Sequence, residues 1–428
     1  MRIMINNNDN NLVELDSYLV GGAVRDKLLG HDVYDNDYVV VGASVEQMLS
    51  LGFSQVGKDF PVFLHPKSKE EYALARTERK QGQGYTGFVC DAAPEVTLEE
   101  DLLRRDLTIN AMAIPMSDIA SSIEDNKIID PYNGRADLEN RVLRHVSSAF
   151  IEDPLRVLRV ARFAARYHNY GFSIADETLQ LMSEISDSGE LSTLSGERVW
   201  QEMQRSLAEA YPEVFFQILR DCNALEKLWP ELNALWGVPN PALWHPEICS
   251  GIHTMMVIQQ AVKLSDKTSV RFAAVCHDLG KSLTLEVHWP SHRGHEKSGL
   301  ALVERICQQL KVPKDHKTLA LKVCEFHLHC HKAFELKAST IVKLFNSLDV
   351  WRKPEEFDDF LITCLADFRG RLGNEIKPYP QMDYLKQAFG IALTVTAKEF
   401  IEKGIKGAEI KTAMNQKRIE KVASIKVT

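Results

Sequence analysis

The sequence lacks a long apolar run. No stretch of its 428 residues reaches the roughly 20 apolar residues that a membrane-spanning helix needs. Residues 1–16 are polar and rich in asparagine, and they lack the apolar core of a signal peptide. Both absences argue against membrane insertion and secretion. We therefore expect a cytoplasmic protein that makes no membrane contact, with residues 1–16 as a polar N-terminal extension.

Paired cysteines and an excess of positive charge are also missing. The eight cysteines are scattered and form no CxxC pair, which favours free thiols in a reducing compartment. The 51 Lys and Arg residues are outnumbered by 59 Asp and Glu residues, giving a net charge of −8. Because phosphate binding needs clustered Lys and Arg, a large nucleic-acid-coating surface is disfavoured, whereas a local basic groove is not excluded.

What is present is typical of a folded protein of several domains. Hydrophobic residues make up 45% and charged residues 26% of the chain, and its length predicts two to four domains. Residues 17–145 have a mixed α/β pattern, and the pattern becomes helical from Asp153 onward. Between Arg76 and Ala93, glycines with charged neighbours predict a mobile loop.

The most informative pattern combines Gly21–Asp26 with two carboxylates, Asp35 and Asp37. Backbone N–H groups at a helix start bind phosphate, and Arg25 adds a charged fork for phosphate oxygens. Asp35 and Asp37 occupy positions i and i+2 of an expected strand, so both side chains point to one face and can hold Mg²⁺. Metals held there can activate a 3′-hydroxyl and neutralise leaving pyrophosphate, which predicts a nucleotidyltransferase.

A second motif spans Asp101–Ala111. Within it, Arg104 and Arg105 suit contacts to a triphosphate or a ribose, whereas the bland alternative is a charged helix end leading into a strand. A third metal-binding carboxylate is not identified by the pattern. Its candidates are Glu71, Glu78 and Asp106.

These motifs, in this order and spacing, closely resemble those of class II tRNA nucleotidyltransferases, the CCA-adding enzymes and their poly(A) polymerase relatives. The matching segments are Gly21–Asp26, Asp35–Asp37 and Arg104–Ala111. The resemblance implies a head like the palm of polymerase β, in which Asp35 and Asp37 are catalytic and bind Mg²⁺. It also implies nucleotide binding by Gly22, Arg25 and Arg105.

The helix expected from about residue 153 to 166 carries Glu152, Asp153 and Arg156 on one face. Such a ladder is ordinarily a surface feature of little energetic weight. However, cytosine and adenine both offer an amine donor beside a ring-nitrogen acceptor, which a carboxylate and an arginine complement. In the resembled family the motif matched here selects C and A without a nucleic-acid template, and Arg159 and Arg162 would support nucleotide binding.

Histidines concentrate further along, with ten of the fourteen between His245 and His331, a skew that suggests metal binding. At the centre, an apolar helix precedes the pair His277 and Asp278. Adjacent His and Asp with a distant His supply ligands for a divalent metal that activates water. This half resembles HD-domain phosphohydrolases, which implies catalytic roles for His277 and Asp278 and a metal site formed by His253, His277, Asp278 and Asp367.

The HD metal is expected to be a transition metal such as Ni²⁺ or Mn²⁺, or Mg²⁺. By the same resemblance we expect phosphatase, 2′-nucleotidase and 2′,3′-cyclic phosphodiesterase activities. Four other histidines in this half are expected to lie mostly on the surface: His288, His292, His329 and His331.

Together the resemblances run from Tyr18 to Lys421 and match bacterial CCA-adding enzymes with a fused HD domain. The expected fold class is α+β, a small mixed nucleotidyltransferase sheet followed by an all-helical neck, body and HD domain. Near residue 198 we expect Glu197 and Arg198 to brace the template helix. The expected domains are a head at 17–148, a neck and body with template helix and tRNA binding at 149–245, an HD domain at 246–370 and a helical tail at 371–428.

The predicted function is addition and repair of the 3′-terminal CCA of tRNA from CTP and ATP. The expected partners are therefore the tRNA acceptor end and the two nucleotides, with the protein as a monomer or a homodimer. Two alternatives remain open at this point. One is a poly(A) polymerase of the same superfamily, and the other is an HD phosphohydrolase whose head only binds nucleotide or RNA.

Overall fold

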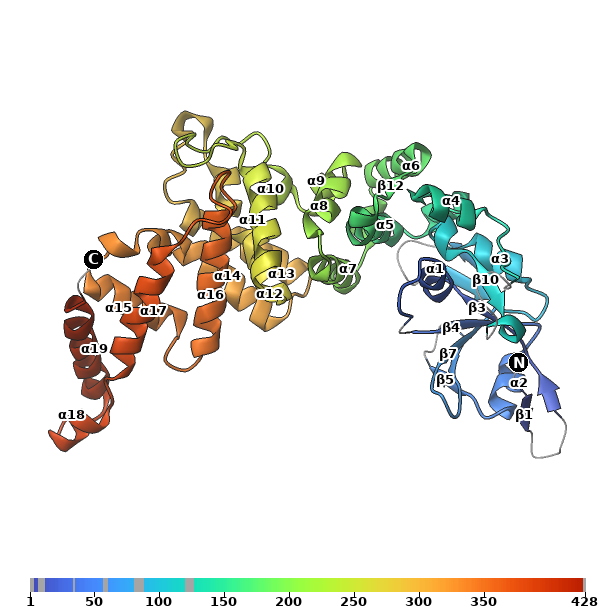
Figure 1. The fold of residues 1–428 in the computed structure, drawn as a ribbon, viewed down its shortest axis with the longest axis horizontal. Helices are drawn as coiled ribbons and strands as arrows, with labels where there is room; N and C mark the ends of the chain where they lie inside the picture. Colours follow the sequence, from blue (N-terminus) through green and yellow to red (C-terminus); the bar gives the residue numbers. More distant parts are fainter. Residues whose placement is uncertain are drawn as a thin grey trace. The chain divides into compact units, whose positions relative to one another are not determined.

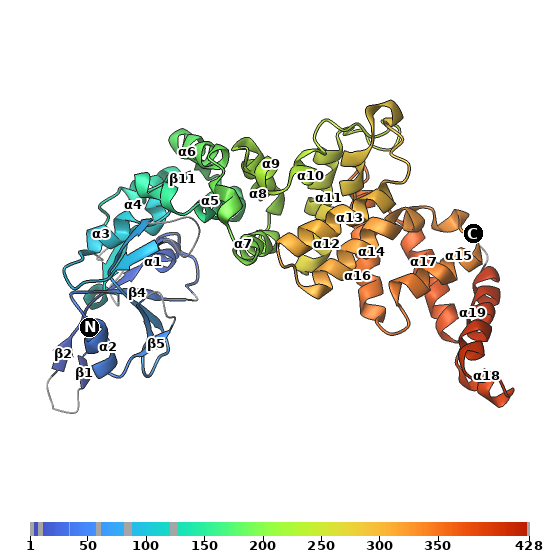
Figure 2. The same ribbon diagram turned by 180° about the vertical axis from the view of Figure 1, so that it is seen from behind.

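The structure is a computed structural model, and it describes residues 4–6, 12–33, 35–56, 61–80, 88–119 and 127–425. The chain divides into two compact units, drawn from opposite sides in Figure 1 and Figure 2. The first unit comprises residues 1–198 and 214–227, and the second comprises residues 199–213 and 228–428. The expected α+β class is confirmed, because a small mixed sheet lies in the first unit and helices follow it.

The first unit is built on a six-stranded sheet in the order β10-β3-β4-β7-β6-β5. Only β4 and β7 run parallel, and all other neighbours are antiparallel. Five of the six strands overlap the runs at residues 17–20, 38–41, 62–64, 71–75 and 111–114 that predict strands, whereas β5 has no such prediction. The bounds of the six strands are β3 (Asp16–Val20), β4 (Asp37–Val41), β5 (Ser54–Val56), β6 (Val62–Leu64), β7 (Glu71–Leu74) and β10 (Ala113–Pro115).

Three two-stranded sheets accompany the main sheet, and one of them corrects the predicted loop at Arg76–Ala93. There β8 (Thr77–Lys80) pairs antiparallel with β9 (Phe88–Asp91), whereas the glycine-rich residues 81–87 lie outside the described residues. The glycines and charges suggested a loop because pairing with a later strand leaves little trace in local composition. The other two sheets pair β1 (Met4–Asn6) with β2 (Leu12–Glu14) and β11 (Val142–Leu143) with β12 (Ser173–Ile174).

Two short helices of the first unit begin at side-chain capping groups. Ser44 and Thr97 each form a reciprocal capping box, with Gln47 and Glu100 respectively. The helices that contribute to the first unit are α1 (Gly22–Leu28), α2 (Val45–Ser50), α3 (Leu98–Leu103), α4 (Gly134–Asn140), α5 (Leu155–Tyr167), α6 (Asp176–Asp187), α7 (Gly196–Ala208), α8 (Pro212–Asp221) and α9 (Ala224–Leu228).

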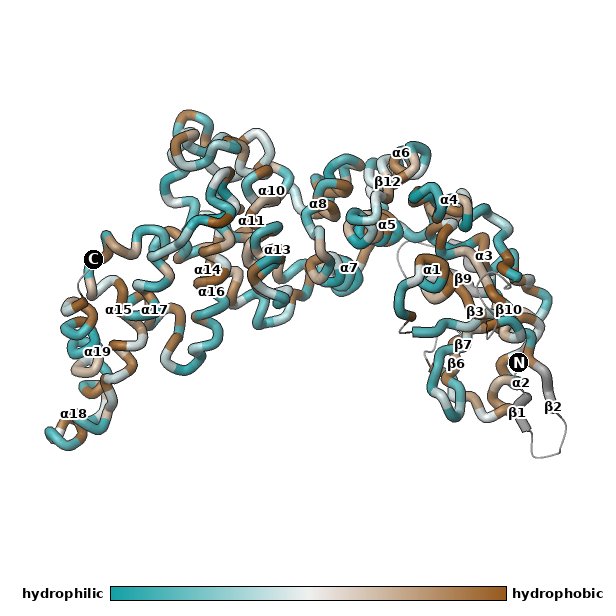
Figure 3. Tube along the Cα trace, in the orientation of Figure 1, coloured by the Kyte–Doolittle hydropathy of each residue, from teal (hydrophilic) through white to brown (hydrophobic). Residues whose placement is uncertain are grey.

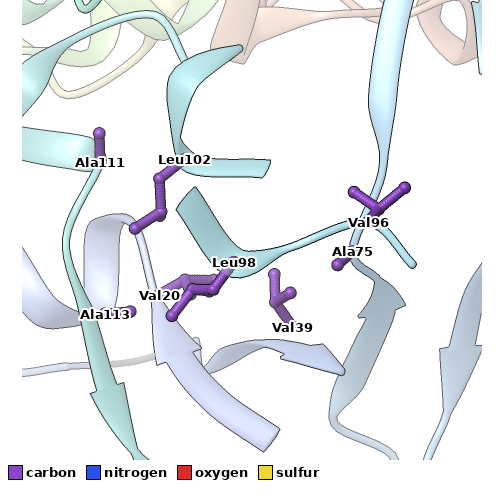
Figure 4. Packing of buried hydrophobic residues seen from close by; sticks show 8 residues of the cluster. All are labelled: Val20, Val39, Ala75, Val96, Leu98, Leu102, Ala111 and Ala113. Atoms are coloured by element: carbon purple, nitrogen blue, oxygen red, sulfur yellow. The ribbon is translucent and has the colours of Figure 1, made fainter. Parts of the chain in front are cut away.

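A buried apolar cluster attaches α3 to the sheet, as Figure 4 shows. From α3 it takes Leu98 and Leu102, and from the sheet it takes residues of β3, β4 and β10. The remaining members are Val20, Val39, Ala75, Val96, Ala111 and Ala113. Because this burial fixes α3, it also fixes the position of Arg104 and Arg105, which follow the last turn of that helix.

Among the described residues of the second unit, the regular elements are helices. Helices α11, α12, α13, α14 and α16 pack on one another. Figure 3 shows brown hydrophobic residues interspersed with teal hydrophilic ones along them, as expected for helices with one buried face. Their bounds, with those of the remaining helices, are α10 (Pro230–Asn233), α11 (Ser250–Leu264), α12 (Thr268–Cys276), α13 (His295–Gln309), α14 (Lys314–His331), α15 (Ala338–Leu348), α16 (Pro354–Arg369), α17 (Pro380–Leu393), α18 (Lys398–Glu402) and α19 (Ala408–Ala423).

Two further expectations concern cysteines and membrane spans. Seven cysteines with described side chains are free, and Cys90 lies outside that set. Among the described residues, no helix combines the length and the apolar character that crossing a membrane requires.

Candidate active sites

In the first unit, the sequence motifs meet at one end of the sheet. Val20, the last residue of β3, pairs with Asp37 at the start of β4, and Asp37 pairs with Glu71 at the start of β7. On the other side, Val20 pairs with Ala113 of β10. The glycine turn after β3, the carboxylates of β4 and β7, and the segment before β10 therefore share this sheet end.

Three carboxylates gather there, namely Asp35, Asp37 and Glu71. The strand begins at Asp37, so Asp35 lies before it and strand alternation does not orient Asp35 as the sequence predicted. Asp37 is solvent-exposed, yet burial by nearby protein atoms raises its pKa, Glu71 and Asp35 raise it further, and only Arg105 opposes them. Mutual repulsion of this kind marks a place where a cation would be stabilised.

The other candidates for a third carboxylate fare differently. Asp106 is buried and accepts hydrogen bonds from Arg159 Nε at 2.8 Å and Asn110 Nδ2 at 3.0 Å. Its carboxylate is therefore used inside the protein. The side chain of Glu78 lies outside the described residues. Glu71 is the candidate that the strand register places beside Asp37.

Gly21 allows Arg105 to approach the turn between β3 and α1. Its φ of 69° lies in the left-handed region, and a Cβ added there would come 2.9 Å from Arg105 Nη1. Arg105 also binds Asp101, with Nη2 3.1 Å from Oδ2. Its Nε is buried and has no hydrogen-bond partner among the described residues, so one donor remains for a ligand.

Asp101 is fully buried and holds both arginines of the motif. Burial alone would raise the pKa of Asp101, but Arg104 and Arg105 lower it more, so it lies below its ordinary value. We expect Asp101→Asn to reduce the free energy of unfolding by about 3 kcal/mol, at the lower end for breaking a buried pair, because both guanidinium groups are partly exposed. Urea unfolding measures this difference.

The acid dependence of that difference has a defined sign. Because the folded pKa of Asp101 is depressed, its contribution is complete above the unfolded pKa of about 3.9 and is lost as the pH falls further. The gap between parent and variant should therefore shrink below that pH. Glu99→Gln, an exposed change on the same helix, should show no gap, and a gap that is independent of pH would contradict the assignment.

Arg25 is placed differently from a ligand-facing residue. It is buried, its Nε and Nη2 donate to the carboxylate of Asp26, and its Nη1 donates to Asn110 Oδ1. Its guanidinium also lies over the rings of Phe163 and Tyr167 in α5, each about 5.3 Å away. Arg25 therefore ties α1 to α5, and its nucleotide-binding role stays a prediction.

The helix expected at about residues 153–166 is present as α5, and charged residues at its start and along it have internal partners. Asp153 Oδ2 lies 2.8 Å from Arg198 Nη2, which is the bracing contact expected of Arg198. The guanidinium of Arg156 donates to the backbone oxygens of Ala149 and Arg104. The side chains of Asp153 and Arg156 are thus held in fixed orientations by these contacts.

Two further arginines of α5 were expected to support nucleotide binding. Arg159 Nη2 lies 2.7 Å from Asp106 Oδ2, and the guanidinium of the buried Arg162 lies 4.5 Å from the centre of the Phe163 ring. Both arginines therefore lie on the side of α5 where Phe163 contacts Arg25 and where Arg159 contacts Asp106.

In the second unit, the four predicted metal ligands come together and are buried. His253 lies on α11, His277 and Asp278 follow α12, and Asp367 lies on α16. His253 Nε2 is 3.1 Å from Asp367 Oδ1, and His277 Nε2 is 3.1 Å from Asp278 Oδ2. The side-chain ligand atoms of His253, His277 and Asp367 all lie within 4.8 Å of one another.

The environment suits a cation. His277 donates from Nδ1 to the backbone oxygen of Ala274, so its Nε2 turns into the cluster. That Nε2 is buried and, among the described residues, has no partner with hydrogen-bond geometry. Burial alone would raise the pKa of Asp278, but His277 and Lys281 lower it more, so the carboxylate is charged. Imidazole nitrogens that face carboxylates are a ligand set for a divalent metal.

The structure also shows site residues that the sequence did not assign. His295 and His327 lie next to Asp278. Lys281 Nζ is 2.6 Å from Asp278 Oδ2. Glu247 Oε1 is 2.9 Å from His253 Nδ1. The histidine skew was a usable signal for His295 and His327. For Lys281 and Glu247 the sequence carried none, because charged residues are common on any surface.

The expectation of surface histidines was wrong for two of the four. His292 is buried and interacts with the backbone oxygen of Pro239, and His331 Nε2 lies 2.5 Å from Asp367 Oδ2. The hydroxyl oxygen of Tyr379 lies 2.7 Å from the other ring nitrogen of His331, Nδ1. His288 is exposed as expected.

Three family models match the chain. The Poly A polymerase head domain matches residues 17–144, the probable RNA and SrmB-binding site of polymerase A matches residues 171–235, and the HD domain matches residues 251–358. Together with the fold, they define a nucleotidyltransferase that carries an HD domain.

Two curated relatives narrow this class. The multifunctional CCA protein of Pseudoalteromonas atlantica is 61% identical over 95% of this chain and 98% of its own length. That of Mannheimia succiniciproducens is 57% identical over 94% of this chain and 96% of its own length. The chain belongs to the multifunctional CCA protein family. A solved Thermotoga maritima CCA-adding enzyme complexed with tRNA shares the fold, with a TM-score of 0.61, 18% identity and coverage of 97% of this chain and 88% of that chain.

Proposed function

We propose that the protein adds C, C and A in turn to the 3′ end of tRNA, using CTP and ATP. In each addition the tRNA 3′-hydroxyl oxygen bonds to the α-phosphorus of the nucleotide. The bond to the bridging oxygen of pyrophosphate breaks, and the hydroxyl proton leaves to solvent. One observation carries this proposal. Three carboxylates, those of Asp35, Asp37 and Glu71, gather beside Arg105 at the end of the sheet where the glycine turn lies.

The acidic side chains of this site would bind a cation, and the basic side chain would bind phosphate. Asp35, Asp37 and Glu71 would hold Mg²⁺. Burial and then the charges of Glu71 and Asp35 raise the pKa of Asp37, and a cation would stabilise the carboxylates gathered there. When bound, Mg²⁺ neutralises the charge that develops on the phosphates. Arg105, with a buried Nε lacking a partner among the described residues, would bind the triphosphate alongside Gly22.

Selection of the base would rest on Asp153 and Arg156. Arg198 fixes the carboxylate of Asp153, and two backbone carbonyls fix the guanidinium of Arg156. Both groups can then present an acceptor and a donor to the edge of cytosine or adenine at little entropic cost. Arg25, Arg159 and Arg162 would support nucleotide binding, and the contacts of Arg25 and Arg159 would also hold α5 against the head.

The HD domain would hydrolyse phosphate esters as a phosphatase, 2′-nucleotidase and 2′,3′-cyclic phosphodiesterase. Water oxygen bonds to phosphorus, the bond from phosphorus to the ester oxygen breaks, and a proton passes to that oxygen. His253, His277, Asp278 and Asp367 would hold a divalent cation such as Ni²⁺, Mn²⁺ or Mg²⁺. When bound, such a cation lowers the pKa of water. Lys281, next to Asp278, carries the positive charge closest to this set.

The remaining proposals follow from the family. The sheet head at 17–148, the neck and body at 149–245, the HD domain at 246–370 and the tail at 371–428 would be the working divisions of the chain. Its partners would be the tRNA acceptor end, CTP and ATP in the cytoplasm, with the protein as a monomer or homodimer.

One assay tests the proposal against both alternatives. Purified protein receives a tRNA that ends before CCA, with CTP and ATP, and the product ends are sequenced. Addition of two C and one A is the expected result. A run of A would point to a poly(A) polymerase. No addition, together with hydrolysis of 2′,3′-cyclic nucleotides, would point to a hydrolase with a binding-only head.

A further inference from the structure

A buried asparagine, Asn240, lies one side chain away from the cation ligands of the second unit. It belongs to the segment between α10 and α11, and only 2% of its surface is exposed. Its backbone N donates to the backbone oxygen of Ile248, 2.7 Å away. The backbone oxygen of the preceding residue, Pro239, lies 2.7 Å from His292 Nε2. These contacts anchor the backbone around Asn240 and so define where its side chain lies.

The hydrogen bonds of Asn240 fix the orientation of its amide. Oδ1 lies 2.9 Å from Lys281 Nζ and 3.1 Å from Ser250 Oγ. A lysine amine only donates hydrogen bonds, so the amide atom that faces it must be the oxygen. The Nδ2 group therefore lies on the other branch of the amide, with two protons to donate.

This Nδ2 group is buried and has no hydrogen-bond partner among the described residues. Buried polar groups in folded proteins are almost always paired, and an unpaired one costs stability. Turning the amide over would not help, because Nδ2 would then face the donors of Lys281. A donor that is fixed and unpaired in this way suits a ligand that supplies an acceptor.

Lys281 connects the asparagine to the proposed hydrolase site. Its Nζ lies 2.6 Å from Asp278 Oδ2 and 2.9 Å from Asn240 Oδ1. The amide of Asn240 is thus one lysine amine away from a proposed cation ligand. The ammonium of Lys281 and the N–H donors of Asn240 both attract negatively charged oxygen. The non-bridging oxygens of a phosphate ester have this charge and accept hydrogen bonds.

A buried water is the alternative partner for Nδ2, in which case Asn240 would serve only to hold Lys281 against Asp278. The two roles use different halves of the amide, because Oδ1 holds the lysine and Nδ2 would bind the ligand. An aspartate at this position keeps the first half and loses the second. The two roles can therefore be separated by substitution.

We propose that Asn240 recognises the phosphate group of the HD-domain substrate, with Nδ2 donating a hydrogen bond to a non-bridging oxygen. This rests on the proposed hydrolase function and deepens it, because it names a residue outside the cation ligands that contacts the substrate. Asn240 transfers no proton. As the water oxygen bonds to phosphorus, a fixed donor beside a non-bridging oxygen stabilises the charge on that oxygen. The same contact holds inorganic phosphate, the product of a phosphatase.

Two substitutions in the full chain separate the two halves of the amide. Asn240→Asp keeps an oxygen for Lys281 and replaces Nδ2 by an oxygen that repels phosphate, whereas Asn240→Ala removes both. We expect each variant to lose about 10²-fold or more in kcat/KM for a 2′,3′-cyclic nucleotide. The dissociation constant of inorganic phosphate from the Mn²⁺-loaded protein should rise by about tenfold or more, as measured by isothermal titration calorimetry.

Other properties of these variants should match the parent. The Mn²⁺ content and the circular dichroism should be unchanged, because Asn240 is not a cation ligand. Addition of CMP to tRNA should persist, because Asn240 belongs to the second unit. Asn346→Asp makes the same change on α15, where Oδ1 also accepts a hydrogen bond, from Trp351 Nε1 at 2.7 Å. This control should keep both hydrolysis and phosphate affinity.

The outcomes separate this inference from the function on which it rests. Full hydrolysis and phosphate affinity in Asn240→Asp, with a loss only in Asn240→Ala, would overturn the inference and show that Asn240 only supports Lys281. A loss of hydrolysis together with a loss of Mn²⁺ would also overturn it, because the effect would act through the cation. In both cases the parent still hydrolyses the cyclic nucleotide, so the hydrolase function stands. A folded parent that hydrolyses no phosphate ester would overturn the proposed hydrolase function and this inference with it.

Discussion

The Asp37→Asn variant is expected to lose nucleotide addition by about 10²–10³-fold, the scale seen when a group that stabilises transition-state charge is removed. Asparagine keeps the size of the side chain and removes its charge, so the three carboxylates at the sheet end become two. Addition of labelled CMP to a tRNA that lacks CCA measures the loss. Hydrolysis of 2′,3′-cyclic nucleotides by the HD domain should be unchanged.

Stability distinguishes this loss from misfolding. Because the folded state raises the pKa of Asp37, the charged carboxylate at neutral pH opposes folding. The melting temperature of Asp37→Asn should therefore equal or exceed that of the parent. Asp32→Asn, an exposed carboxylate in the preceding loop, serves as the matched control and should retain addition. Retained addition in Asp37→Asn, or a lower melting temperature, would contradict the assignment.

Glu71 is the third carboxylate at this end of the sheet. The parallel register places it opposite Asp37, and its charge raises the pKa of Asp37. In the sequence Glu71 was one of three candidates, because the pairing of two strands more than thirty residues apart leaves no local signal. Asp106 was equally plausible until the structure showed its carboxylate bound to Arg159 and Asn110.

The fold was largely predictable where apolar periodicity is strong. The runs at residues 38–41 and 62–64 lie in β4 and β6, and the helical pattern after Asp153 became α5 and its successors. The hairpin of β8 and β9 was missed because its strands are short and one carries three charged residues in four. Such a segment is stabilised by its partner strand, and composition does not report that pairing.

Site residues were predictable by type more reliably than by partner. Arg25, Arg156 and Arg159 suit phosphate or base contacts by chemistry alone, yet each has protein acceptors here. Whether the guanidinium of such an arginine faces a ligand or an acceptor of the protein depends on how α5 packs. The same holds for His331, whose partner Asp367 lies on another helix.

The His277→Ala variant should lose phosphohydrolase activity by more than about 100-fold, the upper range for residues that only support a ligand. His277 would offer Nε2 directly to the cation, and alanine removes this nitrogen from the proposed ligand set of His253, His277, Asp278 and Asp367. Hydrolysis of a 2′,3′-cyclic nucleotide in the presence of Mn²⁺ or Ni²⁺ measures the effect. Addition of CMP to tRNA should persist, because Asp35, Asp37 and Glu71 belong to the first unit of the chain and His277 belongs to the second.

The matched control is His288→Ala, which removes an exposed histidine from the same half and should keep both activities. Together with Asp37→Asn, His277→Ala forms a crossed pair in which each variant loses one activity and keeps the other. That pattern is expected only if the two reactions use separate groups. If either variant loses both activities while its circular dichroism matches the parent, the assignment of two independent sites is wrong, and one metal centre serves both reactions.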